Sequence, residues 1–290
     1  MPLIDVNGVR LEVRRLQPSA RALAQAGECV RPWVGQRAPL VFLHEGLGSV
    51  AMWQTRSGYW PQLVCDATGR DGVVYSRQGY GQSDLVPDVR GEPREIDGRR
   101  QGRLLPDYLH REAWQVLPAL LQAVGIERPA LIGHSDGGSI ALLHAARHPV
   151  AACVVMAPHV MVEDVSIRSI EAARTAFQTT DLRERLARYH ADVDGAFWQW
   201  NDAWLNPAFR AFDIRAECRA ISAPVLAIQG VDDAYGSMAQ IDEIEQQIAA
   251  GSASAGHCLL LKLERCGHSP QRDQEASTVA HIARFLAEWP

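Results

Sequence analysis

The six residues 133–138, Gly-His-Ser-Asp-Gly-Gly, constrain the fold more than any other part of this 290-residue sequence. The apolar run Pro-Ala-Leu-Ile precedes them, and a stretch rich in Ala and Leu with helical character follows them. A Gly-x-Ser-x-Gly segment between a strand and a helix is typical of a sharp turn with a strained backbone, which only small neighbouring residues allow. Gly133 and Gly137 supply that room. The segment therefore predicts an α/β protein in which Ser135 occupies the turn.

Strands and helices alternate along most of the chain, which predicts a mostly parallel sheet with helices on both faces. An Asn-Gly turn near the N-terminus indicates an antiparallel hairpin before this alternation begins. The Gly- and Pro-rich segment 87–106 is expected to be a surface loop. The strands are expected at residues 3–6, 9–14, 39–44, 72–76, 129–134, 151–157, 223–229 and 258–263.

The alternation stops in the third quarter of the chain, where helical stretches follow one another without a strand between them. The simplest explanation is a helical insertion that covers the active site as a cap. We therefore expect an α/β core of residues 1–158 and 216–290 and a helical cap of residues 159–215. The three stretches lie at residues 165–179, 182–190 and 195–205.

Composition and charge narrow the range of partners. The net charge of −5 argues against a basic surface for nucleic acid or anionic lipid. The first residues lack the pattern of a signal peptide, and no apolar run approaches the length of a membrane span. Six cysteines are scattered without zinc-ligand spacing, as expected of reduced thiols in a cytoplasmic protein. A small molecule is the expected partner.

Ser135 is the candidate nucleophile, and a serine hydroxyl needs a base that removes its proton. Around such turns the partners follow in the order serine, acid, histidine. His268 fits, because it follows the last predicted strand and Gly267 lets its loop turn back over the sheet. His134 is adjacent to the serine in sequence and is expected to lie beside the turn. The histidines expected on helix surfaces are His144, His148, His190 and His281.

The acid is expected in the segment Gly-Val-Asp-Asp, where its task is to hold the imidazole in the correct tautomer. The Gly-x-x-Asp spacing selects Asp233, and the neighbouring Asp232 is then a solvated or turn-capping residue. An oxyanion hole also needs backbone N–H groups. We expect these from Asp136, which follows the serine, and from Gly46 in the glycine-rich loop after the strand at 39–44.

Five segments together resemble the α/β-hydrolase superfamily, and within it the bacterial branch of capped esterases, enol-lactonases and carbon–carbon bond hydrolases. They occur in the family's order and cover nearly the whole chain. The resemblance implies the α/β-hydrolase fold, with a mostly parallel eight-stranded sheet, and no cofactor. The segments are His-Glu-Gly-Leu-Gly-Ser (44–49), Gly-Tyr-Gly-Gln-Ser-Asp (79–84), the turn at 133–138, Gln-Gly-Val-Asp-Asp (229–233) and Cys-Gly-His-Ser-Pro (266–270).

Two acidic residues depart from the family pattern. Glu45 stands where the common loop has glycine; we expect its side chain to pair with Arg77, and the alternative is that it faces the pocket. Asp136 stands where many relatives carry Met, Gln or Trp, and its carboxylate could reach the pocket rim. Together the two acids argue against a negatively charged acyl group.

The expected cap is rich in aromatic residues, which either pack the helical layer onto the core or line a pocket for an aromatic or alicyclic substrate. Candidate pocket residues are Glu45, His159, Trp200 and Trp204. The predicted activity is hydrolysis of a small carboxylic ester, thioester or lactone through an acyl-enzyme. The alternatives are carbon–carbon bond hydrolysis of a ring-cleavage product, and a binding or biosynthetic protein that retains the fold without hydrolysis.

Overall fold

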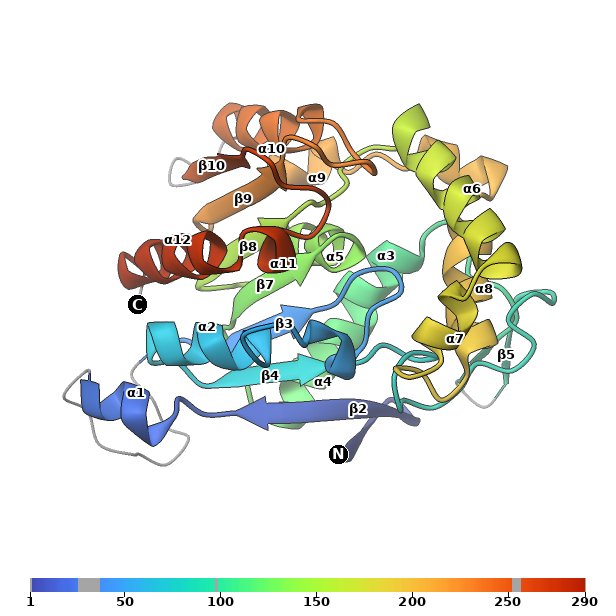
Figure 1. The fold of residues 1–290 in the computed structure, drawn as a ribbon, viewed down its shortest axis with the longest axis horizontal. Coiled ribbons are helices and arrows are strands. Elements are labelled where there is room, and N and C mark those ends of the chain that lie inside the picture. Colours follow the sequence, from blue (N-terminus) through green and yellow to red (C-terminus); the bar gives the residue numbers. More distant parts are fainter. Residues whose placement is uncertain (1, 26–36, 97–98, 252–256, 290) are drawn as a thin grey trace.

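The computed structural model describes residues 2–25, 37–96, 99–251 and 257–289 (Figure 1). Its main feature is an eight-stranded sheet with the strand order β1-β2-β4-β3-β7-β8-β9-β10. The β1–β2 and β2–β4 pairs are antiparallel, and all other neighbours are parallel. The predicted α/β-hydrolase fold with a mostly parallel sheet is thereby confirmed. The strands are β1 (Leu3–Val6), β2 (Val9–Leu16), β3 (Leu40–Leu43), β4 (Gly72–Tyr75), β7 (Ala130–His134), β8 (Ala152–Met156), β9 (Val225–Gly230) and β10 (Cys258–Leu263).

Both faces of the central sheet are covered, so its strands are apolar without interruption. In β3, Val41 and Leu43 point into one hydrophobic cluster, and Leu40 and Phe42 point into the other. Helices α2 (Trp60–Thr68) and α12 (Glu275–Ala287) contribute to the cluster around Phe42. The helices that cover the opposite face are α3 (Tyr108–Arg111), α4 (Leu117–Val124), α5 (Asp136–Ala145), α9 (Arg215–Cys218) and α10 (Ala239–Ala250). Short helices α1 (Ala20–Gln25) and α11 (Pro270–Asp273) complete this core.

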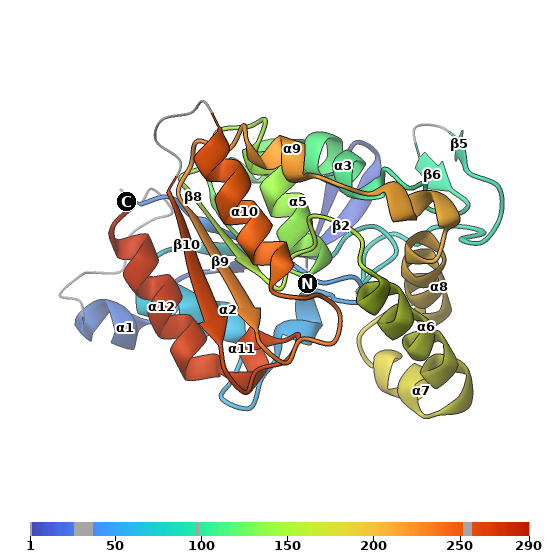
Figure 2. The ribbon, with the colours of Figure 1, turned by 90° about the horizontal axis from the view of Figure 1, so that it is seen from above.

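The chain between β8 and β9 forms a separate helical layer. It contains α6 (Asp164–Thr179), α7 (Leu182–Leu186) and α8 (Val193–Trp204). These helices lie beyond the carboxyl ends of β3, β7 and β8, away from the helices that flank the sheet (Figures 1 and 2). Stacked rings of Phe177 and Phe197, with centroids 3.7 Å apart, join α6 to α8. The predicted helices at 165–179 and 195–205 agree with α6 and α8 within two residues, whereas the helix predicted at 182–190 ends at Leu186.

The segment 87–106 differs from the predicted surface loop. It contains a short antiparallel hairpin, β5 (Arg94–Ile96) and β6 (Arg99–Gln101). Long-range contacts to α8 hold this segment: Arg90 forms an ion pair with Asp202 at 2.7 Å and lies over the ring of Trp198. These partners are more than a hundred residues away in sequence, so local composition could not reveal them.

Two further observations concern the described residues. None of their helices combines the length and the hydropathy needed to cross a membrane. The cysteines among them carry free thiols, and Cys29 lies outside the described ranges. These free cysteines are Cys65, Cys153, Cys218, Cys258 and Cys266.

Candidate active site

Ser135 sits at the turn between β7 and α5 in a strained conformation, with φ 53° and ψ −119°. Such a backbone is costly for a residue other than glycine and persists only where the surroundings impose it. A Cβ atom at Gly133 would collide with the backbone of the first turn of α5, and one at Gly137 would collide with the carbonyl group of Leu43. The chain therefore reverses tightly at the carboxyl end of β7, where the sequence predicted the turn.

Ser135, His268 and Asp233 come together from three loops. The His268 Nε2 atom lies 3.0 Å from Ser135 Oγ, and His268 Nδ1 lies 2.9 Å from both carboxylate oxygens of Asp233. The Tyr235 amide donates to Asp233 Oδ1 at 2.8 Å. Burial alone would raise the pKa of the Asp233 carboxyl, but its hydrogen bond to His268 and the nearby positive charge hold that pKa below its ordinary value. Asp232, the competing acid, is exposed.

His134 fixes the main chain that carries the candidate base. Its Nε2–H donates to the carbonyl oxygen of His268 at 2.6 Å, and its Nδ1 accepts from the Gln271 side chain at 3.0 Å. This pattern requires the neutral ring, and burial lowers the pKa of His134 to about 4, which keeps it neutral near pH 7. His134 thus lies beside the turn, as the sequence predicted, and supports the loop of His268.

The Arg77 side chain holds the main chain of the loop that follows β3. The Arg77 guanidinium donates to the carbonyl oxygens of His44, Glu45 and Gly46 at 3.3, 3.0 and 3.4 Å. Within the described residues, the Gly46 amide and the Asp136 amide donate to no other group. Both amides belong to segments that border Ser135, so they are available to an oxyanion bound there.

The Asp136 side chain is buried beneath this loop and does not reach the pocket rim. Its carboxylate accepts hydrogen bonds from the Tyr108 hydroxyl at 2.7 Å and from the Trp204 indole at 3.1 Å. Arg77 Nη2 lies 3.6 Å from it. The possibility that this acid faces the pocket was wrong, because its carboxylate is turned toward these buried partners. The partners come from distant elements, so the local sequence could not reveal them.

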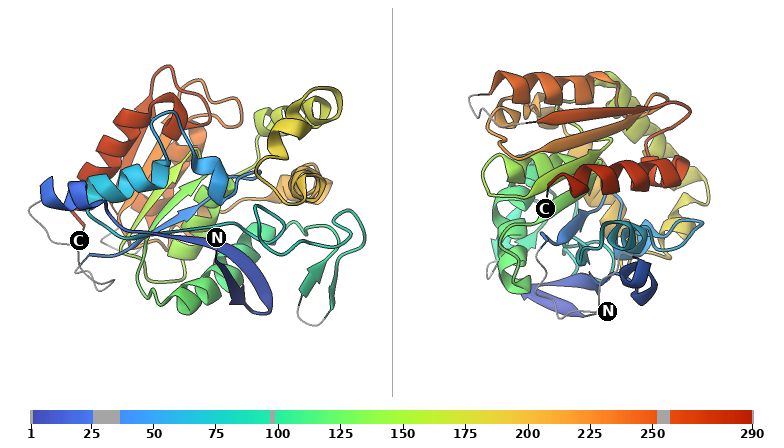
Figure 3. Two further views of the ribbon diagram at one scale, coloured as in Figure 1. Left: turned by 60° about the horizontal axis from the view of Figure 1, so that its bottom comes forward. Right: turned by 90° about the vertical axis from the view of Figure 1, so that its left-hand side faces the viewer.

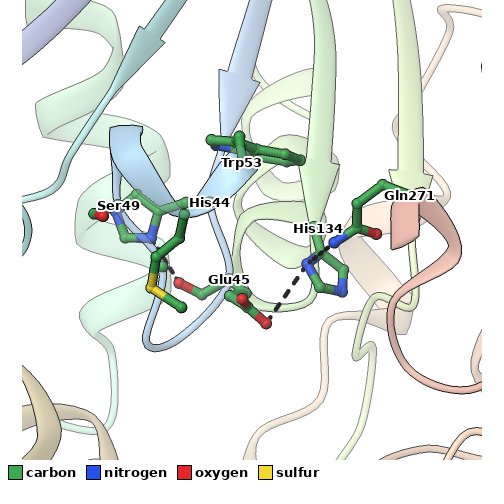
Figure 4. Close-up of a pocket in the computed structure, with 8 residues that line it drawn as sticks. His44, Glu45, Ser49, Trp53, His134 and Gln271 are labelled. Atoms are coloured by element: carbon green, nitrogen blue, oxygen red, sulfur yellow. Dashed lines mark hydrogen bonds and ion pairs between the residues drawn. The ribbon is translucent and has the colours of Figure 1, made fainter. Parts of the chain in front are cut away.

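The Glu45 side chain does not pair with Arg77 either, so that expectation was also wrong. Its Oε2 atom lies 3.6 Å from His134 Nδ1 (Figure 4), while Arg77 binds the backbone carbonyl of Glu45. Burial alone would raise the pKa of the Glu45 carboxyl, but the neighbouring histidine and arginine side chains hold it below its ordinary value. The Glu45 side chain retains 23% exposure, and the residue borders both the cavity at Ser135 and the small pocket beside His134 toward which its carboxylate points (Figure 4).

A cavity of about 230 Å³, here called the Ser135 cavity, lies between the sheet and the helical layer. The Trp200 indole lies against Gly46 and closes one side. The rings of Trp204 and His159 meet edge to face at 4.9 Å. His159 Nε2–H donates to the Tyr235 carbonyl at 3.1 Å, and its buried Nδ1 has no partner among the described residues. The lining residues are Glu45, Gly46, Leu47, Ser135, His159, Ser166, Ile170, Trp200, Trp204, Tyr235, His268 and Ser269.

Sequence reasoning missed the role of His190, which was expected on a helix surface. The side chain is buried and joins the helical layer to two loops of the core. Its Nδ1 accepts from the Gly81 amide at 3.1 Å, and its Nε2–H donates to the Leu47 carbonyl at 3.0 Å. His144 is likewise buried, with Nδ1–H donating to the Ala113 carbonyl at 2.9 Å. No local signal in the sequence distinguishes these histidines from exposed ones.

Comparisons with known proteins agree with this architecture. A model of the alpha/beta hydrolase family matches residues 40–281. The enol-lactonase from Burkholderia xenovorans is 18% identical with a TM-score of 0.67, over 99% of this chain and 100% of that one. A meta-cleavage product hydrolase from Pseudomonas fluorescens is 16% identical with a TM-score of 0.66, over 99% of this chain and 98% of that one. A structure from a study of carboxylesterases of Nitrososphaera gargenis is 18% identical with a TM-score of 0.64, over 97% of each chain. At these identities the likeness concerns the fold.

The buried histidines predict a loss of stability in mild acid. Burial lowers the pKa of His134, His144 and His190 from 6.5 to about 4. The unfolded chain therefore binds protons more readily, and the free energy of unfolding falls as the pH drops from 6.5 toward 4, by about 3 kcal/mol for each histidine. We expect urea unfolding at pH 7 and at pH 4.5 to show this fall.

A matched variant separates this effect from the titration of carboxylates. In His144→Asn, the amide can still donate to the Ala113 carbonyl, but the titrating group is gone. The free energy of unfolding of this variant should also fall between pH 7 and pH 4.5. Its fall should be about 2–3 kcal/mol smaller than the fall in wild type. Equal losses in the two proteins would contradict the buried neutral state of His144.

Proposed function

Because the chain belongs to the alpha/beta hydrolase family, we propose that it is a serine hydrolase that cleaves a small carboxylic ester, thioester or lactone through an acyl-enzyme at Ser135. One observation carries the proposal: Ser135 Oγ lies 3.0 Å from an imidazole whose other nitrogen faces both carboxylate oxygens of Asp233 at 2.9 Å. A nucleophile, a base within hydrogen-bond reach and a group that orients the base are what acyl transfer requires.

In the proposed reaction, neutral His268 accepts the Ser135 proton at Nε2 while Oγ attacks the substrate carbonyl carbon. Asp233 accepts the Nδ1–H hydrogen bond, keeps the reactive tautomer and stabilises the imidazolium that forms. The amides of Gly46 and Asp136 bind the developing oxyanion. His268 then gives its proton to the leaving group, and a water molecule activated by the same histidine hydrolyses the acyl-enzyme.

The Ser135 cavity favours a small, uncharged, aromatic or alicyclic substrate. Ile170, Trp200 and Trp204 give it an apolar wall, and its volume of about 230 Å³ lies below that of pockets for drug-sized ligands. The ionised Glu45 repels an acyl group that carries a second carboxylate. In this proposal residues 159–215 act as a cap over a core of residues 1–158 and 216–290, and the cap sets substrate preference.

The first test is labelling of Ser135. A fluorophosphonate probe should label the wild-type protein, and Ser135→Ala should lose labelling together with at least about 10³-fold in kcat on p-nitrophenyl esters. Ser237→Ala, which changes an exposed serine outside the cavity, should label and turn over like wild type. Turnover of a ring-fission product by wild type, without turnover of any ester or lactone, would shift the assignment to carbon–carbon bond hydrolysis. A folded Ser135→Ala protein with normal activity would overturn the proposal altogether.

The two adjacent aspartates provide a matched pair. Asp233→Asn should lower kcat by about 10⁴-fold, because an amide at this position favours the wrong imidazole tautomer. Asp232→Asn removes the same charge from an exposed neighbouring position and should leave kcat within about twofold of wild type, as surface substitutions usually do. Steady-state kinetics on one ester decides the matter, and the reverse ranking would transfer the role to Asp232.

The tryptophans of α8 test the proposed cap. Trp200→Ala removes the indole beside Gly46 and should raise kcat/KM for bulky acyl esters relative to short ones, by about tenfold for a difference near 1.4 kcal/mol. Trp198→Ala is the matched control, because Trp198 is half-buried, lies beside Arg90 and does not line the Ser135 cavity. Both variants should be assayed at a temperature where each is folded. The same change of substrate ranking in both, or in neither, would refute a pocket role for Trp200.

A further inference from the structure

A second cavity of about 200 Å³, here called the Arg100 cavity, shares no lining residue with the Ser135 cavity. Residues of the β1–β2 hairpin, the loop after β4, strand β6, helix α3 and helix α8 line it. Figure 3 shows these elements on one side of the molecule, with the N-terminal hairpin in blue near the green helices and the teal β5–β6 hairpin. Gln199 faces the Arg100 cavity and the next residue, Trp200, faces the Ser135 cavity, so α8 separates the two.

Two buried hydrogen-bond donors at this cavity lack an acceptor. The Tyr80 hydroxyl lies near the Arg77 guanidinium, which can only donate, so neither this hydroxyl nor the Gln199 Nε2 amide has an acceptor among the described residues, although the two residues are only 3% and 1% exposed. Gln199 Oε1 accepts from Arg100 Nη2 at 2.9 Å, which fixes the orientation of the amide and leaves Nε2 as the free donor. Unsatisfied buried polar groups are rare and costly, and they call for an explanation.

Arg100 adds an uncompensated positive charge. Its guanidinium donates to Gln199 Oε1 and to the Gly102 carbonyl, and none of the described carboxylates lies within 4.0 Å of it. Burial lowers the pKa of Arg100 to about 10, so it remains charged at neutral pH. Arg100 is part-buried, and a guanidinium without an ionic partner at the wall of a cavity is available to form a charge-assisted hydrogen bond with an anion. Arg77 also borders the cavity, but its charge is already opposed by Asp136.

Among the described residues, the other charged groups at this cavity form no ion pair with Arg100. Glu112 accepts a hydrogen bond from the Tyr75 hydroxyl at 2.9 Å and forms no ion pair with Arg100 within 4.0 Å, and burial raises the pKa of its carboxyl. Glu95 and Arg111 are exposed at the rim, where water screens them. The rest of the wall is largely apolar and includes Val6, Leu11, Leu104 and Val116. A complementary ligand therefore has one anionic, acceptor-rich end and an apolar body.

We propose that the Arg100 cavity is a second binding site, which takes a small organic monocarboxylate. The carboxylate lies against the Arg100 guanidinium and accepts from the Tyr80 hydroxyl and the Gln199 amide, while the apolar body lies against the aliphatic wall. A volume of about 200 Å³ admits a body about the size of a benzene ring. The site is distinct from that of the proposed hydrolysis, since none of its lining residues touches the reacting atoms at Ser135; Arg77 alone borders it and also holds the loop of Gly46.

The test is calorimetric titration with sodium benzoate, with benzyl alcohol as the uncharged analogue. Benzoate should bind the wild-type protein, and benzyl alcohol should bind at least about tenfold more weakly, as expected when a charged hydrogen-bonding group is lost. Arg100→Gln should weaken benzoate binding by at least about tenfold, and Tyr80→Phe, which removes a single hydroxyl, by about threefold to tenfold.

Two controls locate the site. Arg99→Gln makes the same charge change at the exposed residue next to Arg100, which does not line the cavity, and Ile170→Ala alters the Ser135 cavity; both should bind benzoate within about twofold of wild type. Three results would overturn the proposal: no benzoate binding by wild type at tens of millimolar, equal binding of benzoate and benzyl alcohol, or loss of binding in Ile170→Ala with retention in Arg100→Gln and Tyr80→Phe. Because each arm measures binding, failure here leaves the hydrolase proposal standing, and failure of labelling at Ser135 leaves this one standing.

Discussion

The buried ion pair between Arg77 and Asp136, with 3.6 Å between its charged groups, organises the region around Ser135. Taking both charges out of water is expensive, and such a pair is tolerated only when further hydrogen bonds satisfy both partners. Both members of this pair have such hydrogen bonds. Arg77 donates to three consecutive carbonyl oxygens of the loop after β3, and Asp136 accepts from Tyr108 and Trp204. Removal of one member would leave the other as an unpaired buried charge, a loss of about 3–5 kcal/mol.

This arrangement connects the helical layer to both backbone amides proposed for the oxyanion hole. Trp204 of α8 binds the side chain of Asp136, whose own amide is one of the two donors. Trp200 lies against Gly46, which supplies the other, and His190 binds the Leu47 carbonyl one residue further along that loop. The position of the amides therefore depends on the packing of α8, and a preorganised donor is more effective than one that must be ordered during the reaction.

The sequence allowed the fold and the positions of Ser135, His268 and Asp233 to be predicted because these depend on local patterns and on chain order. A strand, a glycine-flanked serine and a helix can be recognised within about fifteen residues, and the acid and histidine loops follow identifiable strands. The directions of acidic side chains could not be predicted in this way. The bond from Trp204 to Asp136 spans 68 residues and that from His190 to Leu47 spans 143. The β5–β6 hairpin escaped prediction for the same reason, since its segment is held by contacts with α8.

The geometry of α8 explains how one helix can serve two unlike cavities. Trp200 and Trp204 are four residues apart, so they share a face, and this face closes the Ser135 cavity with apolar surface. Gln199 is rotated by about 100° from Trp200 around the helix axis and turns its amide toward Arg100 on the other side. Arg77 lies where the two regions meet: it borders the Arg100 cavity, and its guanidinium holds the carbonyls next to the Gly46 amide. The buried polar groups around α8 thus fall into two sets. The Asp136 carboxylate finds its hydrogen-bond donors within the protein, whereas the Tyr80 hydroxyl and the Gln199 amide lack an acceptor among the described residues.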